Sequence, residues 1–375
     1  YVSAADIMFL IVFAYGYVYM LTENGTLNRA IRVLTRKLGS RTYLLIPVCM
    51  FLFGILGATL GIFEEVYGLI SVFMGITVAL GYDAVVGGAV VYVGVATGFA
   101  AAITNPFSVG IAQSIAELPI SSGLWYRVVI FLVFQSASVW YVMRYAKRVK
   151  ADPTRSIIYG EQAAVPPAPA EDGGEMTLRQ KICLLLFFVT IGVLLYGTSA
   201  WGWYVDEIAA WFLMMMVVTG IAGGYSATEI CKGFIESTRS IVPSLLTMQD
   251  AMISDTIVYG LSKLLGSGNK ALAAVGMLFL QNVINFFITG SSSQATITMP
   301  IMVPVADIVG VGRETAVLAY CFGDGFSDMF WPTACALQCG LMGIPLNKWY
   351  RFMAPLFFIM VVLQTAFIVI SAYLY

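Results

Sequence analysis

The sequence contains one pattern twice. A Leu-Gly-Ser run at 38–40 recurs at 265–267, each time at the end of an amphipathic stretch and the start of an apolar one. The aligned positions include Gly81–Gly94 with Gly310–Gly323, Gly61 with Gly290, and Thr104 with Thr333. Their common offset of about 230 residues is far longer than the period of a solenoid repeat. The pattern therefore predicts two similar halves, with a binding site where the halves meet.

Composition assigns these halves to a membrane. Hydrophobic residues make up 59% of the chain and charged residues 11%, outside the usual range for a soluble domain. Runs such as 182–200 and 352–374 are long enough to cross a hydrocarbon core of about 30 Å. They are continuous rather than alternating, which favours helices over barrel strands. We expect an all-α polytopic membrane protein without a metal site, and the net charge of −1 gives no sign of a nucleic-acid partner.

Clusters of basic residues give the expected orientation. They lie at 29–41, 144–181 and 348–351, and the positive-inside rule assigns all three to the cytoplasm. Tracing the spans from these clusters, with one span at 241–258, puts the amphipathic segments 24–40 and 253–265 on opposite sides of the membrane. The two repeats are therefore expected to be inverted.

Three units follow from this trace. Residues 1–146 form the first inverted repeat, 147–180 a cytoplasmic linker, and 181–375 the second repeat. Each repeat is expected to hold an interfacial arm helix, a re-entrant hairpin and a discontinuous span; in the first half the hairpin covers 44–80 and the span 83–118. The chain does not begin with methionine, so we expect the front of the first repeat to be missing.

Four polar stretches interrupt the apolar segments. Each combines glycine or proline, which end helices, with hydroxyl, amide or carboxylate oxygens. Because lipid cannot satisfy the freed backbone groups, such breaks persist only where they are buried or line a cavity. Helix N-termini suit anionic groups there, and unwound carbonyls suit a hard cation such as Na⁺. The breaks are 57–65, 102–110, 289–296 and 323–333.

Acidic side chains fall within these breaks, namely Glu64, Glu65, Asp324 and Asp328. Burying each costs about 2.5 to 3.5 kcal/mol on an insertion scale unless it is paired or hydrated. No lysine or arginine lies in the breaks, so the acids favour a cation, either a coupling ion or a charged group of the substrate. For any single acid, capping a hairpin helix is the alternative role. Other acids, including Asp83 and Glu314, are expected at the membrane interface.

Four runs carry a resemblance to a known family: GYDAVVGGAVVYVG, TNPFSVGIAQ, TMPIMVPVADIVGV and FGDGFSDMFWPT. Through them nearly the whole chain resembles the YfcC-type family of basic amino-acid antiporters, in the anaerobic four-carbon dicarboxylate carrier group of the ion-transporter superfamily. The resemblance implies a homodimer in which a scaffold domain holds a mobile transport domain. Interfacial arm helices would move that domain as an elevator.

The resemblance also implies cation-binding loops in both halves. Matched by position, they fall on Thr59, Gly61, Thr104 and Asn105, and on Gly290, Ser291, Ser292, Ser293 and Thr333. The sequence departs from the family pattern at 289–294, where it reads Thr-Gly-Ser-Ser-Ser-Gln. The substrate and the ion stoichiometry therefore stay open.

We predict a secondary active transporter, not an enzyme, that moves a small organic solute. A basic amino acid is favoured, carried by Na⁺-coupled symport or by exchange, with H⁺ as the other coupling ion and no cofactor. Glu64 and Glu65 are expected to meet the cationic end of the substrate, with Asp324 and Asp328 in the same site. Asn105, Ser292 and Thr333 are expected to hold its carboxylate.

Other functions are weaker alternatives. A four-carbon dicarboxylate carrier should offer fewer acids, and an ion channel is also conceivable. Tyr82-Asp83 with the run at 322–325 resembles an intramembrane aspartyl protease, but Asp83 begins its span whereas Asp324 lies well inside another. We expect a multi-pass protein of the bacterial cytoplasmic (inner) membrane, in contact with lipid and assembled as a homodimer.

Overall fold

All regular structure in the described residues is helical. The structure is a computed structural model that describes residues 5–26, 29, 33, 42–63, 66–120, 122–160, 176–201, 203, 205–247 and 269–375. The first elements are α1 (Ala5–Glu23), η2 (Thr42–Leu44), α3 (Leu45–Leu60), α4 (Tyr67–Ala79), α5 (Ala84–Ala101), η4 (Pro106–Gly110), α6 (Ile111–Ile115), α7 (Leu124–Ala151) and η5 (Pro153–Arg155). The later ones are α8 (Leu178–Ala200), α9 (Val205–Gly223), α10 (Ala227–Thr247), α12 (Lys270–Phe287), α13 (Ser291–Val309), α14 (Arg313–Gly325), η6 (Ser327–Met329), α15 (Pro332–Met342) and α16 (Leu346–Leu374).

Five segments among the described residues are long and apolar enough to cross a membrane. They are Ala84–Ile115, Leu124–Ala151, Asp206–Gly223, Lys270–Phe287 and Leu346–Leu374. The first is buried along its whole apolar window. Its helix α5 consists mainly of Gly, Ala and Val, and such small residues let helix backbones approach closely. At Gly98 a side chain would collide with the backbone of Gly54, so α3 and α5 touch main chain to main chain.

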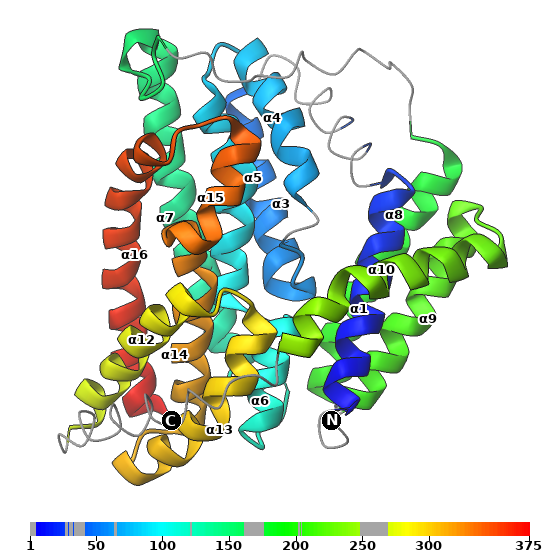
Figure 1. The fold of residues 1–375 in the computed structure, drawn as a ribbon, viewed down its shortest axis with the longest axis vertical. Coiled ribbons are helices and arrows are strands. Elements are labelled where there is room, and N and C mark those ends of the chain that lie inside the picture. Colours follow the sequence, from blue (N-terminus) through cyan, green and yellow to red (C-terminus); the bar gives the residue numbers. More distant parts are fainter. Residues whose placement is uncertain are drawn as a thin grey trace.

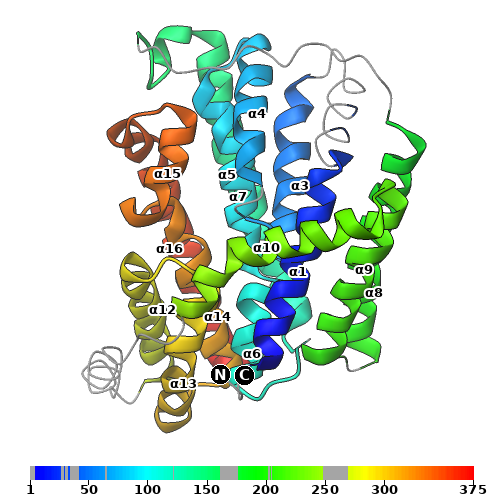
Figure 2. The same cartoon turned by 45° about the vertical axis from the view of Figure 1, so that its right-hand side comes forward.

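The same order of elements occurs in both halves of the chain. A helical hairpin, α3–α4 or α12–α13, is followed by a helix that ends near the middle of the molecule, α5 or α14. After a non-helical or irregular stretch come a short helix, α6 or α15, and a long one, α7 or α16. The hairpin α3–α4 lies in the upper part of Figure 1 and α12–α13 in the lower part, an arrangement that Figure 2 also shows.

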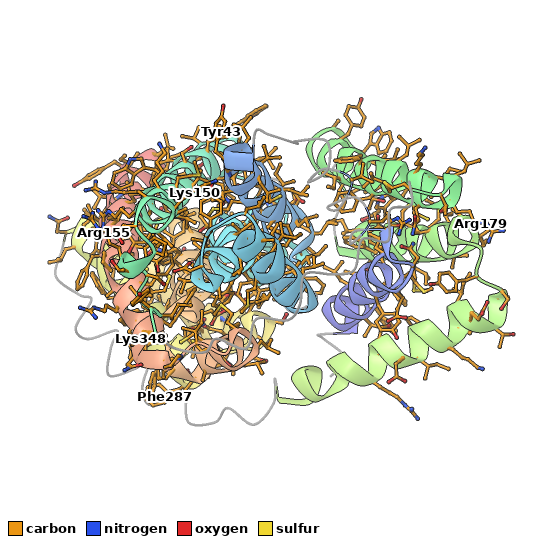
Figure 3. All side chains as sticks on the ribbon, turned by 90° about the horizontal axis from the view of Figure 1, so that it is seen from above. Tyr43, Lys150, Arg155, Arg179, Phe287 and Lys348 are labelled. Atoms are coloured by element: carbon orange, nitrogen blue, oxygen red, sulfur yellow. The ribbon has the colours of Figure 1, made fainter. Side chains whose placement is uncertain are left out.

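Helices α1, α8, α9 and α10 form a second group beside these elements. Seen from above, α1, α8 and α9 stand apart from the larger group (Figure 3). Helix α10 lies across α1 in both side views and contacts α13. The sequence predicted a span at 241–258 that the described residues do not show, because 241–247 complete the crosswise helix α10 and 248–258 lie outside them. The arm segment 253–265 also lies outside the described residues, as do most of 24–40 and the linker residues 161–175.

Two predicted breaks begin later than expected. Helix α3 continues to Leu60, so Gly57 and Thr59 are helical and the chain turns at Gly61, whose φ of +67° is left-handed. Helix α14 continues to Gly325, so Asp324 belongs to a helix. In both places the helix packs closely against a neighbouring helix, and its backbone hydrogen bonds continue past the glycines that were expected to end it. Glu64 and Glu65 lie outside the described residues.

Candidate functional site

The two central breaks lie against each other. A side chain at Gly325, the last residue of α14, would come within 2.6 Å of the Ala100 backbone near the end of α5. In addition, the Tyr92 hydroxyl on α5 donates to the carbonyl of Asp328 at 2.8 Å. The irregular segments 102–105 and 326–331 therefore start from neighbouring points in the core.

The tip of the first hairpin packs directly on the first break. The backbone N–H of Thr104 donates to Ala58 O at 3.0 Å, and the Thr104 hydroxyl donates to Thr59 O at 3.2 Å. A side chain at Gly61 would collide with the Asn105 amide. The structure thus brings together Thr59, Gly61, Thr104 and Asn105, which came from two separate stretches of sequence. Thr59 takes part through its carbonyl, because its hydroxyl donates to Ile55 O in its own helix at 2.6 Å.

Asn105 caps the segment that follows the break and keeps one group unused. Its Oδ1 accepts from Phe107 N at 2.9 Å, and Pro106 occupies the first helical position, where the missing N–H costs nothing. Both Asn105 and Ser108 are fully buried. Among the described residues, neither Asn105 Nδ2 nor Ser108 Oγ has a hydrogen-bond partner. A buried donor without a partner is costly, so this position is suited to an acceptor on a ligand.

The second hairpin reaches the same place from the other half. Ser292, in the first turn of α13, donates to the carbonyl of Phe107 at 3.2 Å. Gly290 caps α13 without a side-chain hydrogen bond, and a side chain on it would contact Ser293. Ser291 donates to the Asp324 carboxylate and accepts at its carbonyl from Tyr320 at 2.7 Å. The N-terminus of α13 therefore lies between the first break and α14.

The remaining predicted residues occupy different environments. Asp324 is fully buried on α14. Asp328 is 5% exposed in η6. Thr333 is exposed in the first turn of α15, two residues after Trp331, whose indole donates to Asn282 O at 2.7 Å. Thr333 thus follows the second break, which this hydrogen bond attaches to α12.

Two residues that the sequence did not assign to the site support the breaks from behind. Arg127, the fourth residue of α7, donates to the carbonyl of Ala102 at 3.4 Å. Trp349, the fourth residue of α16, donates to the carbonyl of Met329 at 2.9 Å. Both side chains are buried. Each half therefore has a long helix with a buried N–H donor that holds a carbonyl of its own break.

Two acids that the sequence expected at the membrane interface have partners within the protein. Glu314 is 6% exposed and lies 3.8 Å from the Arg127 guanidinium, while Gln113 donates to it at 3.4 Å. Asp83 likewise is buried, because it caps α5 and accepts from Tyr145 at 2.6 Å. A partner from another helix thus contacts each carboxylate and offsets part of the cost of burying it.

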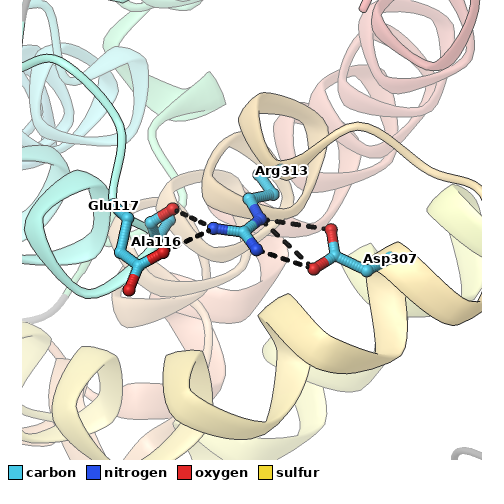
Figure 4. A network of polar contacts seen from close by, with 4 residues as sticks. All are labelled: Ala116, Glu117, Asp307 and Arg313. Atoms are coloured by element: carbon cyan, nitrogen blue, oxygen red, sulfur yellow. Dashed lines mark hydrogen bonds and ion pairs between the residues drawn. The ribbon is translucent and has the colours of Figure 1, made fainter.

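A second basic side chain joins the halves at their lower edge. Arg313 binds Asp307 with its Nε and Nη2, the latter at 2.9 Å, and with Nη1 it reaches Glu117 Oε2 at 3.1 Å and the carbonyl of Ala116 at 3.0 Å (Figure 4). The loop after α6 is thereby attached to the turn between α13 and α14. These exposed contacts contribute modestly to stability, but they fix the relative position of the two loops.

All regular structure in the described residues is helical, with several apolar helices and buried polar breaks, as expected for an integral membrane protein. Comparison with known proteins gives its family. The profile of DcuC, the C4-dicarboxylate anaerobic carrier, matches residues 1–373. The chain belongs to this family of secondary transporters and is not an enzyme.

Individual relatives agree with this assignment. The chain is 30% identical to an Escherichia coli protein named "Putative basic amino acid antiporter YfcC", over 97% of this chain and 76% of that protein. It is 26% identical to an uncharacterized protein of Haemophilus influenzae, over 100% of this chain and 77% of that one. The fold is similar to the crystal structure of the Alcanivorax borkumensis YdaH transporter, whose topology is described as unusual, with a TM-score of 0.68, 14% identity and coverage of 96% and 84% of the two chains.

Proposed function

We propose that this protein carries a small zwitterionic or cationic solute, most simply a basic amino acid, by Na⁺-coupled symport or by exchange. One observation carries the proposal: the two halves present opposite polarity at the centre. The first break offers the unused donors Asn105 Nδ2 and Ser108 Oγ, whereas the second half offers the buried carboxylate of Asp324. Donors suit a carboxylate and an acid suits an ammonium or guanidinium group. The name of the Escherichia coli relative supports the same substrate class.

In this proposal, residues from both hairpins hold the substrate. Asn105 and Ser292, joined through Phe107, bind the substrate carboxylate near the N-termini of η4 and α13, where helix dipoles favour an anion. Asp324 and Asp328 bind its cationic end. Thr333 contributes from the start of α15. Glu64 and Glu65 remain candidates for the cationic end, but they lie outside the described residues.

We propose an elevator mechanism built on two inverted repeats, over residues 1–146 and 181–375 with a linker at 147–180. The opposite placement of the hairpins α3–α4 and α12–α13 supports inverted repeats and re-entrant hairpins (Figure 1). The crosswise helix α10, which contacts both α1 and α13, is suited to transmit movement between the two groups of helices.

Orientation follows from the basic residues. Lys150, Arg155, Arg179 and Lys348 lie at the end of α7, in η5 and at the starts of α8 and α16, which are all in the upper part of Figure 1. By the positive-inside rule we assign this end to the cytoplasm of a bacterial inner membrane. A homodimer, held by the second group of helices, completes the proposal.

Transport of the substrate would be coupled to the cations because the cations have to bind before the hairpin tips can pack. A cation at the first site, formed by Thr59, Gly61, Thr104 and Asn105, would be coordinated by oxygens of the hairpin tip and of the first break, which Thr104 already joins through the carbonyls of Ala58 and Thr59. A second cation at Gly290, Ser291, Ser293 and Thr333 would be coordinated in the same way in the other half. Without both ions the polar tips stay exposed, and such groups cross an apolar environment only at a large cost.

A C4-dicarboxylate carrier is the second candidate, and the family description favours it. The unused donors at Asn105 and Ser108 would suit a dicarboxylate equally well. The buried Asp324, which has no ion-pair partner among the described residues, argues against a second carboxylate in the same site.

Uptake into proteoliposomes separates these candidates. Labelled arginine and labelled succinate are supplied in turn, with and without an inward Na⁺ gradient and with unlabelled ornithine inside. Arginine uptake that rises with internal ornithine or with external Na⁺ supports the amino-acid proposal and separates exchange from symport. Succinate uptake without an arginine signal refutes it in favour of the dicarboxylate carrier. Asn105→Leu should abolish either flux, because it removes the unused donor.

A further inference from the structure

The amide of Asn285 on α12 has an unusual set of neighbours. Its Nδ2 lies 3.1 Å from Gln294 Oε1, 3.2 Å from Asp324 Oδ1 and 3.4 Å from the carbonyl of Asp324. An amide nitrogen carries two hydrogens, so it cannot satisfy three acceptors. Among the described residues, the other end of the same amide, Oδ1, has no partner at all. The nitrogen Nδ2, which has fewer hydrogens than neighbouring acceptors, and the oxygen Oδ1, which has no partner, belong to the same side-chain amide. Rotation of that amide exchanges their positions.

The three residues come from three different helices and are completely buried. Asn285 lies near the end of α12, Gln294 in the first turns of α13, and Asp324 near the end of α14, each with 0% exposure. Gln294 is fixed by its own amide nitrogen, which donates to Gln281 O at 3.0 Å and to Gln281 Oε1 at 2.8 Å. Its Oε1 is therefore directed toward Asn285.

An ionised Asp324 would have no cationic side chain beside it among the described residues. Asp324 accepts from Ser291 and Asn285, both neutral, and none of the ion pairs in the described part of the chain includes it. Burying a carboxylate without a cation is expensive even when it is hydrogen-bonded. The N-terminus of α13 at Ser291 offers only a fraction of a positive charge.

We propose that Asn285, Gln294 and Asp324 form a binding site for one small monovalent metal cation of the size of Na⁺. Rotation of the Asn285 amide replaces its nitrogen by Oδ1, and the space between the acceptors is then bounded by four oxygens: Asn285 Oδ1, Gln294 Oε1, Asp324 Oδ1 and the Asp324 carbonyl. Oxygen ligands are those that hard cations prefer, and a single carboxylate balances a single positive charge.

This site deepens the proposed function and rests on it. It lies deeper than the tip residues Gly290, Ser291 and Ser293 and uses other side chains. Asp324 gives its Oδ1 and its carbonyl to the ion, and its Oδ2 and Asp328 remain for the cationic end of the substrate. Because Ser291 donates to the same carboxylate and begins α13, occupancy of the site is coupled directly to the position of the second hairpin tip.

The test measures cation binding without any substrate. The purified full-length protein in detergent is heated in increasing NaCl, with choline chloride keeping the ionic strength constant. The wild-type Tm is expected to rise with Na⁺, as for any ligand that binds only the folded state. Asn285→Leu and Gln294→Leu are expected to raise the apparent Kd for Na⁺ at least tenfold.

Asn282→Leu is the matched control. Asn282 lies one turn earlier on α12, and its amide nitrogen donates to Leu278 O within its own helix at 2.9 Å. This variant should keep the Na⁺ dependence of the wild type. A Tm that is the same in Na⁺ and choline, or an Asn282→Leu variant that loses Na⁺ binding as completely as Asn285→Leu, overturns the proposal.

A measurement on the wild type alone covers the case in which the variants do not fold. Hydrogen–deuterium exchange of the peptide spanning 285–294 should slow in Na⁺ relative to choline, whereas unchanged exchange there overturns the site. These two experiments contain no substrate, so their results do not depend on whether the protein transports an amino acid. Na⁺ binding at this site without arginine uptake would refute the proposed substrate and leave the cation site standing.

Discussion

Replacing Arg127 by Gln removes the buried cation behind the first break, and its cost can be worked out from the structure. Arg127 is 1% exposed, and its partner Glu314 is 6% exposed. Removing one member of a buried ion pair leaves an uncompensated charge, which costs about 3 to 5 kcal/mol. We therefore expect Arg127→Gln to lower the free energy of unfolding by about that amount.

The double variant Arg127→Gln with Glu314→Gln separates charge from hydrogen bonding. It removes the unpaired carboxylate, so the remaining loss is mainly the hydrogen bond to the Ala102 carbonyl. A charged donor to a carbonyl is worth about 1.5 to 3 kcal/mol. Ala102 itself has a left-handed φ of +44°, which an alanine adopts at a cost of about 1 to 2 kcal/mol, so this carbonyl needs a fixed partner. The double variant should recover roughly 2 kcal/mol relative to Arg127→Gln, from the difference between these ranges.

Denaturant titration of the purified protein measures both variants. Arg148→Gln, an exposed change on the same helix α7, is the control and should stay within about 0.5 kcal/mol of the wild type. If Arg127→Gln costs less than about 1 kcal/mol, or if adding Glu314→Gln deepens the loss, the two side chains do not compensate one another as a buried pair and the reasoning is refuted.

Three further predictions concern other parts of the fold. Gly61→Ala should abolish transport while leaving insertion into the membrane intact, because a side chain at this left-handed position would collide with the first break; transport at the wild-type rate would contradict this. Trp349→Phe should cost about 1 to 3 kcal/mol in denaturant titration, since the carbonyl of Met329 loses its buried donor. Hydrogen bonds from Arg313 hold the pKa of Asp307 below its usual value of 3.8, so the stability they give is present above that usual value and is lost as the pH falls through the lowered pKa. Asp307→Asn should remove this part of the acid dependence of Tm, and an unchanged acid limb would show that the contact does not matter for stability.

Glycines that the sequence aligns between the two halves adopt the same backbone conformation in one case and different ones in another. Gly81 and Gly310, aligned by the repeat, both adopt left-handed φ values, +83° and +71°, and α5 and α14 each begin three residues later. Gly61 and Gly290 are aligned by the same offset, yet their φ values are +67° and −98°. The difference arises because α3 continues to its aligned glycine whereas α12 ends earlier, at Phe287.

The candidate site was predictable only in part. The polar residues of the breaks, such as Asn105 and Asp324, stand out in an apolar sequence. Arg127 did not, because it lies on a long helix outside every break and reaches Ala102 only through the packing of α7 on α5. Asn285 likewise appeared to be one polar residue of an apolar helix. Its importance depends on which atoms of α13 and α14 face it, and nothing within α12 encodes that.

The contact between Gly98 and Gly54 has a consequence for recognising distant relatives. Because the two helix backbones touch there, any side chain at Gly98 would require α3 and α5 to separate. A side chain at Gly57 would meet the backbone carbonyl of Val95 in the same way. In any chain that keeps this packing, the positions aligned with Gly98 and Gly57 have to remain without a side chain. These two positions are thus a signature of the helix crossing that can be searched for at identities too low for overall similarity to be informative.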